Sequence, residues 1–230
     1  MNKPAQSLRR AGSLFFCLLG LIYTISTQTS SARPLRPLPN ARAGSLTVAA
    51  LTRDLHRIKT FEAKFTEHVS NSALKSHANH IGRVWIERPN RFRWLYVAPH
   101  REIITADGRA LWIYDVTLEQ VTVRPMAPSL GATPAMLLAG SRPLISLFKI
   151  TIKPMDQGRQ WALLEPRAPH SEFRKIDIEL RKGVPEGMIL WDRLGEKTEI
   201  RFSAIRINHP INPQRFRFAP PKGVAVIGHP

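Results

Sequence analysis

Cysteine is almost absent from this sequence: among 230 residues the only one is Cys17, inside an apolar run near the amino terminus. If that run is removed, the remaining chain has no thiol for catalysis, no disulfide and no cysteine ligand for a metal. The composition therefore permits an oxidising compartment without requiring one.

Acidic side chains are also few, because 17 Asp and Glu stand against 34 Lys and Arg and give a net charge of +17. Lys3, Arg9 and Arg10 contribute three of these charges, so loss of the amino-terminal segment lowers the net charge by 3 to +14. An excess of this size favours anionic partners, namely lipid headgroups, acidic protein surfaces or nucleic acid, through an attraction that salt screens.

Long apolar stretches are limited to residues 14–25. Basic residues precede this run and small polar residues follow it, which is the pattern of a secretory signal with cleavage expected at Ser30-Ser31-Ala32. The run is shorter than the about 20 residues of a membrane span, although an uncleaved anchor stays the alternative. Cys17 lies within the run rather than behind it, so lipidation is disfavoured.

The rest of the chain is expected to form a single exported domain. Residues 1–32 are the predicted signal peptide, and residues 33–44, with three prolines and three arginines, predict a flexible lead-in. Residues 45–230 are long enough for one sizeable domain and show no internal repeat and no sign of a second domain.

Residues 82–96 carry the pattern around which the other segments are arranged. They predict two strands joined by a tight corner at Arg88-Pro89-Asn90. In the second strand Phe92, Trp94 and Tyr96 recur at period two, so their rings share one face. A row of rings on one sheet face must be covered by a second sheet, a helix or a ligand; an ordinary filled core is the simplest interpretation.

Two helices are predicted. Ser45 is a candidate N-cap for the first, which has Leu51, Leu55 and Ile58 on one face. The second occupies residues 134–139 and is short and apolar nearly all round. A helix that brief cannot be stable alone, so it must lie on an apolar surface, either as a fixed plug or as a movable lid. Its end signals are a possible cap at Thr133, a proline in its first turn and Gly140 just past its end.

Strands dominate elsewhere. Asp107-Gly108 between two apolar runs predicts a hairpin, and the polar residues 71–79 predict a loop. About ten or eleven strands, mostly joined by short turns, favour an antiparallel meander that curls into a barrel. Besides the focal pair, runs with strand character lie at 61–66, 102–106, 110–114, 120–124, 148–152, 161–164, 176–181, 188–191, 198–203, 205–207 and 216–218.

Seven short motifs, in order from about residue 45 to 228, resemble one known family. They are Phe61-Xaa-Ala63-Xaa-Phe65, Arg88-Pro89-Asn90-Xaa-Phe92-Xaa-Trp94, Thr105-Ala106-Asp107-Gly108, Leu111-Trp112-Ile113-Tyr114, Glu119-Gln120-Val121-Thr122, Thr133-Pro134-Ala135-Met136-Leu137-Leu138 and Phe218-Ala219-Pro220-Pro221-Lys222-Gly223-Val224. Each is weak alone, but their number and order are specific. The chain resembles the periplasmic outer-membrane lipoprotein carrier family (LolA type).

The resemblance implies a mainly β fold with helices: an unclosed antiparallel half-barrel of about 11 strands with a helical lid over a hydrophobic cavity. Family members accept acylated lipoproteins from an inner-membrane ABC exporter, shield their acyl chains and deliver them to an outer-membrane receptor. The implied protein is a periplasmic chaperone, monomeric and transiently close to membranes. The alternative is a periplasmic lipid-binding or sensor module of the same fold that does not transfer lipoproteins.

The resemblance also implies roles for particular residues. Arg88 matches the family's latch arginine, which ties the barrel to the lid in the closed, empty state; a solvated corner residue is the ordinary alternative. Phe92 matches a cavity position that is sensitive for transfer. The acyl-chain cavity is expected to be lined by Phe61, Phe65, Trp85, Phe92, Trp94 and Tyr96, and the lid helix to contain Pro134, Ala135, Met136, Leu137 and Leu138.

Catalytic interpretations find little support. His77 and His80 are three residues apart in the expected loop, without a nearby carboxylate or cysteine ligand. Ser171 follows His170, and neighbours in a strand point to opposite faces. The sequence has no glycine-rich phosphate loop and no metal motif, so we expect no enzyme activity, no cofactor and no metal. Nucleic acid is disfavoured because the arginines are scattered on outward strand positions.

Overall fold

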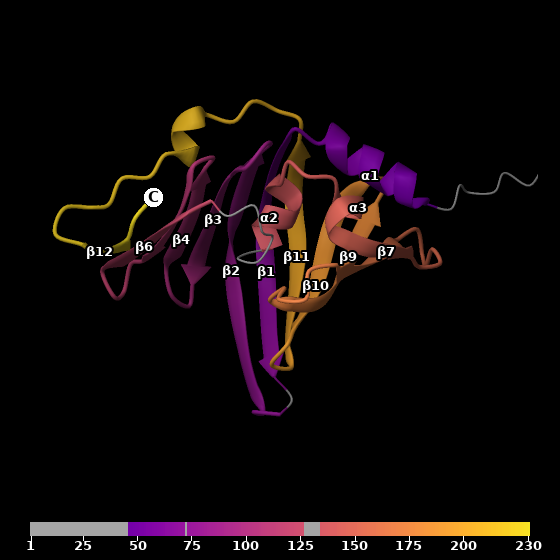
Figure 1. The fold of residues 1–230 in the computed structure, drawn as a ribbon, viewed down its shortest axis with the longest axis horizontal. Helices are drawn as coiled ribbons and strands as arrows, with labels where there is room; N and C mark the ends of the chain where they lie inside the picture. Colours follow the sequence, from indigo (N-terminus) through magenta and orange to yellow (C-terminus); the bar gives the residue numbers. More distant parts are fainter. Residues whose placement is uncertain (1–45, 72, 127–133) are drawn as a thin grey trace, which may run out of the picture. The chain divides into compact units, whose positions relative to one another are not determined.

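The computed structural model describes residues 46–71, 73–126 and 134–230. Within these ranges, twelve strands form one sheet in the order β12-β6-β5-β4-β3-β2-β1-β11-β10-β9-β8-β7 (Figure 1). The strands are β1 (Thr60–Asn71), β2 (Ser76–Glu87), β3 (Arg91–Ala98), β4 (Glu102–Asp107), β5 (Ala110–Asp115), β6 (Gln120–Pro125), β7 (Phe148–Ile152), β8 (Gln160–Pro166), β9 (Phe173–Arg181), β10 (Val184–Asp192), β11 (Glu196–Ile207) and β12 (Ala225–Gly228).

The sheet is unclosed, with β12 at one edge and β7 at the other. The prediction of a mainly β, unclosed fold is therefore confirmed. Neighbouring strands are antiparallel with one exception, because β12 pairs with β6 in parallel. This parallel edge strand, which the sequence pattern did not predict, raises the strand count from the expected ten or eleven to twelve.

Two tight turns set the register of the central strands. Asn90, between β2 and β3, has φ 61°, and Gly108, between β4 and β5, has φ 98°; both residue types tolerate this left-handed region. The carboxylate of Asp107 accepts two backbone N–H groups of its turn, both at 2.8 Å, and the indole N–H of Trp112 at 3.0 Å. Burial by itself raises the pKa of Asp107, but these hydrogen bonds outweigh it and hold the pKa below its usual value. The predicted corner and hairpin are confirmed.

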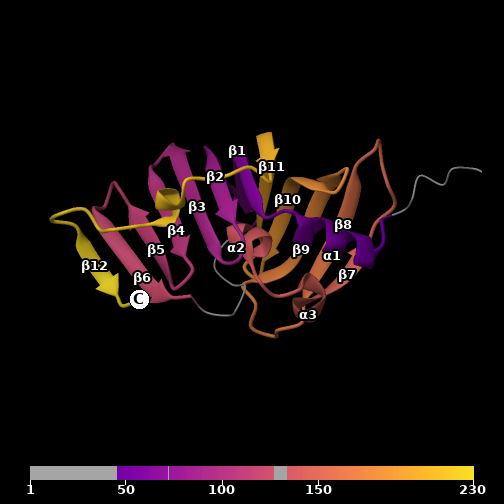
Figure 2. The same cartoon turned by 90° about the horizontal axis from the view of Figure 1, so that it is seen from above.

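Three helices lie over one face of the sheet and share a core with it: α1 (Val48–Arg57), α2 (Pro134–Ala139) and α3 (Leu144–Leu147) (Figure 2). In α1, Leu51 and Leu55 are buried as predicted. The observed N-cap is Thr47, whose hydroxyl accepts the N–H of Ala50 at 3.1 Å; the candidate caps Ser45 and Thr133 lie outside the described residues. None of the described helices has the length and hydropathy of a membrane span.

The predicted loop at residues 71–79 is wrong, because β1 extends to Asn71 and β2 already begins at Ser76. The backbone ladder of a hairpin does not require apolar side chains, and polar pairs across it replace them. His68 and Asn79, for example, are joined at 2.7 Å. A polar composition was therefore a poor guide to backbone pairing in this long hairpin.

The last strand was also misplaced. Asn212 accepts the N–H of Gln214 at 2.9 Å, and Pro213 follows it at the first helical position, so this segment forms the 3₁₀ helix η1 (Pro213–Phe216) instead of a strand. Phe216 is buried. Phe218 packs against Trp112, with ring centroids 5.6 Å apart. The contacts of Phe216 and Phe218 thus hold the carboxyl-terminal segment against the sheet between η1 and β12.

Candidate functional site

Aromatic rings from β1, β3 and β11 meet on the face that the helices cover. We call this the ring face; it carries Phe61, Phe65, Phe92, Trp94, Tyr96 and Phe202. The rings of Phe65 and Trp94 are 4.4 Å apart, and those of Phe65 and Tyr96 are 5.4 Å apart and nearly perpendicular. Phe202, which sequence reasoning missed, lies 5.4 Å from Phe61 and 6.2 Å from Trp94. Five of the six predicted cavity residues are therefore brought together.

Gly82 makes the contact between β1 and β3 possible. In the register, Phe65 on β1 is opposite Gly82 on β2, and Gly82 is opposite Tyr96 on β3. A Cβ atom at Gly82 would collide with the backbone carbonyl of Leu95 and lie 2.5 Å from the ring of Phe65. The missing side chain thus lets a ring from one strand reach across the next. A single glycine inside an alternating strand was the available signal.

Trp85 is the sixth predicted cavity residue, and the structure separates it from the others. It pairs with Arg93 on β3, whereas its neighbour Val84 pairs with Trp94, so Trp85 points to the opposite side of the sheet. There the guanidinium of Arg215 lies 4.3 Å from the centre of the Trp85 ring. Trp85 is buried, but under the tail and not against the ring face.

Helix α2 packs on the part of the ring face that β2 and β3 form (Figures 1 and 2). Ala135, Leu137, Leu138 and Ala139 are buried there, and Met136 is half-buried against the same core. The helix has only six residues, so its conformation depends on this contact rather than on its own propensity. The predicted apolar helix thus lies on the sheet face that carries the predicted rings.

Arg88 and Asn90 hold the carboxyl end of α2. The backbone N–H of Asn90 donates to the carbonyl of Ala139 at 2.9 Å. The guanidinium of Arg88 donates to the carbonyl of Gly140 at 3.5 Å, a long hydrogen bond, while its Nε is buried without a partner in the described structure. Burial lowers the pKa of Arg88. The corner therefore fixes the helix by one short backbone bond and one long charged bond, of which sequence reasoning found only the second.

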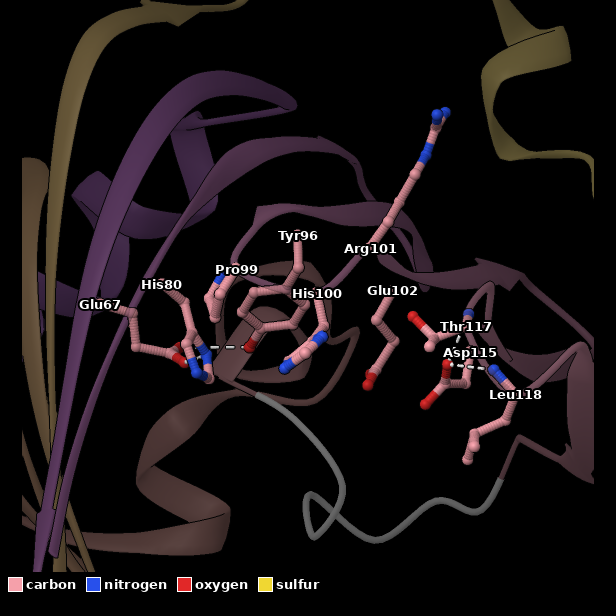
Figure 3. A pocket seen from close by; sticks show the side chains of 10 residues that line it. All are labelled: Glu67, His80, Tyr96, Pro99, His100, Arg101, Glu102, Asp115, Thr117 and Leu118. Atoms are coloured by element: carbon pink, nitrogen blue, oxygen red, sulfur yellow. Dashed lines mark hydrogen bonds and ion pairs between the residues drawn. The ribbon is translucent and has the colours of Figure 1, made fainter.

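A pocket of about 480 Å³ lies beside Tyr96, at the end of β1, β2 and β3 away from this corner (Figure 3). The buried carboxylate of Glu67 accepts the phenol of Tyr96 at 3.2 Å and contacts Nδ1 of His80 at 3.1 Å. Burial raises the pKa of Glu67, although its two partners oppose the rise. Burial also raises the pKa of Glu102, as does the neighbouring Asp115. The apolar ring face thus ends in a polar, acidic rim.

The residues considered for catalysis do not form a catalytic centre in the described structure. His77 and His80 lie in β2 rather than in a loop. His170 and Ser171 lie in the connection between β8 and β9, where Arg193 binds the carbonyl of Ser171 at 2.7 Å. Among the described residues, no group of three or more His, Cys, Asp and Glu side chains is placed to hold a metal ion. The chemistry available at the ring face is apolar contact and hydrogen bonding.

The sequence comparisons with known proteins agree on one family. The model of the family described as outer membrane lipoprotein carrier protein LolA matches residues 56–219. The chain is 37% identical over 187 residues to an outer-membrane lipoprotein carrier protein of Chromobacterium violaceum, covering 81% of this chain and 90% of that one. It is also 37% identical over 194 residues to the carrier protein of Alkalilimnicola ehrlichii, with 84% and 89% covered.

Among solved structures, a LolA superfamily protein from Nitrosomonas europaea aligns with a TM-score of 0.48 at 12% identity, covering 75% of this chain and 98% of that one. The assignment to a family rests on the sequence matches.

Proposed function

This chain belongs to the LolA family of outer membrane lipoprotein carrier proteins, and from that premise we propose that it is a periplasmic chaperone whose ring face shelters the acyl chains of lipoproteins. Residues 1–32 serve as the cleaved export signal and residues 45–230 as the carrier domain. An inner-membrane ABC exporter supplies the cargo, and an outer-membrane receptor removes it.

The observation that carries this proposal is the seating of a six-residue apolar helix on a face of aromatic rings. Burying an acyl chain is worth about 0.8 kcal/mol per methylene, so a chain of ~16 carbons gains on the order of 13 kcal/mol. Helix α2 covers the rings with a few aliphatic side chains, among them Leu137 and Leu138. An acyl chain offers more apolar contact to the same rings and can therefore displace the helix.

Release requires the opposite step, in which α2 returns to the ring face. A permanently open apolar cavity would retain its cargo or aggregate. The hydrogen bonds from Arg88 and Asn90 to the end of α2 favour the closed state, and a charged donor contributes about 1.5–3 kcal/mol at most for each bond. The cost of opening is thus small beside the gain from acyl burial, and the cycle needs no covalent chemistry.

The acyl-binding residues in this proposal are Phe61, Phe65, Phe92, Trp94 and Tyr96, with Phe202 added from the structure. Their rings are buried or half-buried beneath the helices in the closed state. Trp85 is left out because it lies on the other side of the sheet. Pro134, Ala135, Met136, Leu137 and Leu138 form the lid, and Arg88 is its latch.

The direct test is to incubate the purified protein with spheroplasts and to analyse the supernatant for lipoproteins. The carrier proposal expects lipoproteins in a soluble one-to-one complex with the protein. Heat-denatured protein is the control for detergent-like extraction. Absence of release, together with tight binding of a free fatty acid, would replace the carrier with the lipid-binding module of the same fold.

A further inference from the structure

Four arginines gather on the side of β2, β3 and β4 opposite to the ring face. We call Arg83, Arg93, Arg101 and Arg215 the arginine cluster. Trp85 lies at its centre: the guanidinium of Arg215 lies 4.3 Å and that of Arg83 5.9 Å from the centre of the Trp85 ring. Arg93 is the cross-strand partner of Trp85. Figure 3 shows that the side chain of Arg101 points away from the other residues that line the pocket beside Tyr96.

The cluster lacks counter-charges within the described residues. None of its members is in an ion pair there. Glu62, the cross-strand neighbour of Trp85, is paired with Arg206 at 3.8 Å, and Glu87 is paired with Arg91 at 2.5 Å. Burial lowers the pKa of Arg93, and the positive charges of Arg215 and Arg101 lower it further. Like charges held together without a partner favour binding of an anion.

The fold holds Arg215 in this place. It belongs to η1, which begins at the Asn212 cap and is fixed by the buried side chain of Phe216. Arg93 is half-buried in β3 and reaches the hydroxyl of Thr105 only at 3.4 Å. Because both guanidinium groups are positioned before any ligand arrives, little side-chain entropy is lost when they bind one.

Two exposed apolar residues lie on the same side. Ile81 and Val97 are 49% and 53% exposed. They lie where the register of β2 and β3 shifts, because Ile81 pairs with Ala98 and Gly82 with Tyr96, which leaves Val97 unpaired between them. Arginines beside exposed apolar side chains match the interface of a bilayer, where phosphates lie above acyl chains. A free anion or an acidic protein surface would leave the apolar pair without a partner.

We propose that the arginine cluster, with Ile81 and Val97, is a docking site for the phosphate groups of an anionic phospholipid bilayer. The site lies on the side away from the ring face, so the protein can touch a membrane while its lid remains free to move. The proposed carrier function gives the protein a reason to approach a membrane, whereas the evidence for the site comes from the arginine cluster and the exposed apolar residues.

The test is co-sedimentation of the full mature protein with lipid vesicles. One set contains phosphatidylcholine alone, and the other contains phosphatidylcholine with phosphatidylglycerol. We expect binding to the anionic vesicles, weakened by added salt, and little binding to the neutral ones. Equal binding to both sets would overturn the proposal.

Paired variants locate the site. Arg93→Gln with Arg215→Gln should weaken binding to anionic vesicles by roughly 10- to 30-fold. Because Arg93 is half-buried, Arg83→Gln with Arg101→Gln provides a second pair of exposed members with the same expected loss. Arg142→Gln with Arg174→Gln removes the same charge at exposed positions outside the cluster and should change binding much less. An equal loss of vesicle binding in this control pair would show that net charge alone explains the effect, and it would overturn the proposed site.

Two further arms separate a bilayer from other anions. Inorganic phosphate, added at constant ionic strength, should compete only weakly; complete competition would indicate a site for free phosphate instead. Polyglutamate should also compete weakly, whereas tight binding to it without vesicle binding would indicate an acidic protein partner.

The apolar part of the site is tested separately, because Val97→Ser should weaken vesicle binding several-fold. The vesicles contain no lipoprotein, so none of these outcomes bears on cargo transfer.

Discussion

The two sides of β2, β3 and β4 are built from alternate residues of the same strands, and each is covered by a short helical segment, but in different ways. On the ring face, α2 is held by aliphatic contacts and by hydrogen bonds to its last carbonyls. On the arginine side, η1 is held by the buried ring of Phe216 and by the contact of Arg215 with Trp85. In the proposed function an apolar guest replaces the first kind of cover, whereas the second depends on specific side chains.

The largest expected effect comes from emptying the ring face. Trp94→Ala should lower the free energy of unfolding by about 3–5 kcal/mol, because Trp94 is 1% exposed and packs near three other rings. Release of lipoproteins per folded molecule should fall as well. Leu95→Ala alters the next residue, which points to the arginine side, and should leave release nearly unchanged. Urea titration and the spheroplast assay measure both quantities; equal loss of release in the two variants would remove the distinction between the sides.

Gly82→Ala should be next in size. Its Cβ would collide with the carbonyl of Leu95 and the ring of Phe65, and overpacking of this kind costs about 1–3 kcal/mol. The loss should be accompanied by a changed near-ultraviolet circular dichroism signal, because the contact between Phe65 and Trp94 is disturbed. Gly195→Ala is a control at a turn without close neighbours, although its positive φ of 87° adds some strain. A fully stable Gly82→Ala protein with unchanged spectra would show that the rings do not require the glycine.

Arg88→Leu tests the cover of the ring face without changing the rings. A weak charged hydrogen bond is worth about 1.5 kcal/mol, so its loss should favour the open state roughly tenfold. The variant should load cargo and deliver it poorly, because return of α2 no longer drives release. Transfer from purified complexes to outer membranes measures this step, with Arg109→Leu as an exposed arginine control. Unchanged transfer would exclude Arg88 from the mechanism.

The smallest effect concerns the acidic end of the ring face. Burial raises the pKa of Glu67 above its ordinary value of 4.5, so its contribution to stability is complete below about pH 4.5 and is lost as pH rises through the raised value. Glu67→Gln should therefore become more stable relative to the parent protein as pH rises through this window. Urea midpoints at several pH values measure the change, with exposed Glu119→Gln as a control. A difference that is constant with pH would contradict the raised pKa.

Much of the ring face could be predicted, because period-two alternation is a local property of one strand. The rings of Phe92, Trp94 and Tyr96, the hairpin at Asp107-Gly108 and the apolar character of α2 all follow from short stretches of sequence. Arg88 required the family resemblance, since an arginine before proline has no particular meaning by itself. The structure confirms the ring positions, the hairpin and the apolar helix, whereas the role of Arg88 as a latch stays a prediction.

What failed depended on pairing between strands. The face of Trp85 is set by the register across the corner, where Glu87 pairs with Arg91, and no local pattern fixes that register. Phe202 joins the rings because β11 pairs with β1, from which it is separated by most of the domain. The polar ends of β1 and β2 lacked the apolar alternation by which strands are recognised. Pairing between strands thus decided each of these positions, within a hairpin for Trp85 and for the polar ends of β1 and β2, and across most of the domain for Phe202.

The central claim is that acyl chains replace α2 on the ring face. Spin labels at Ser141→Cys, just beyond α2, and Lys64→Cys, exposed on β1, report the position of the helix relative to the sheet. Cys17 is the only native cysteine, and a protein that begins at residue 33, after the proposed signal peptide, does not contain it. Pulsed electron paramagnetic resonance measures the distance between the two labels. It should give one short, narrow distance distribution for the empty protein, and a longer, broader one after a triacylated peptide is bound. The same peptide without acyl chains should have no effect. An unchanged distribution in the acyl-loaded protein would contradict the account.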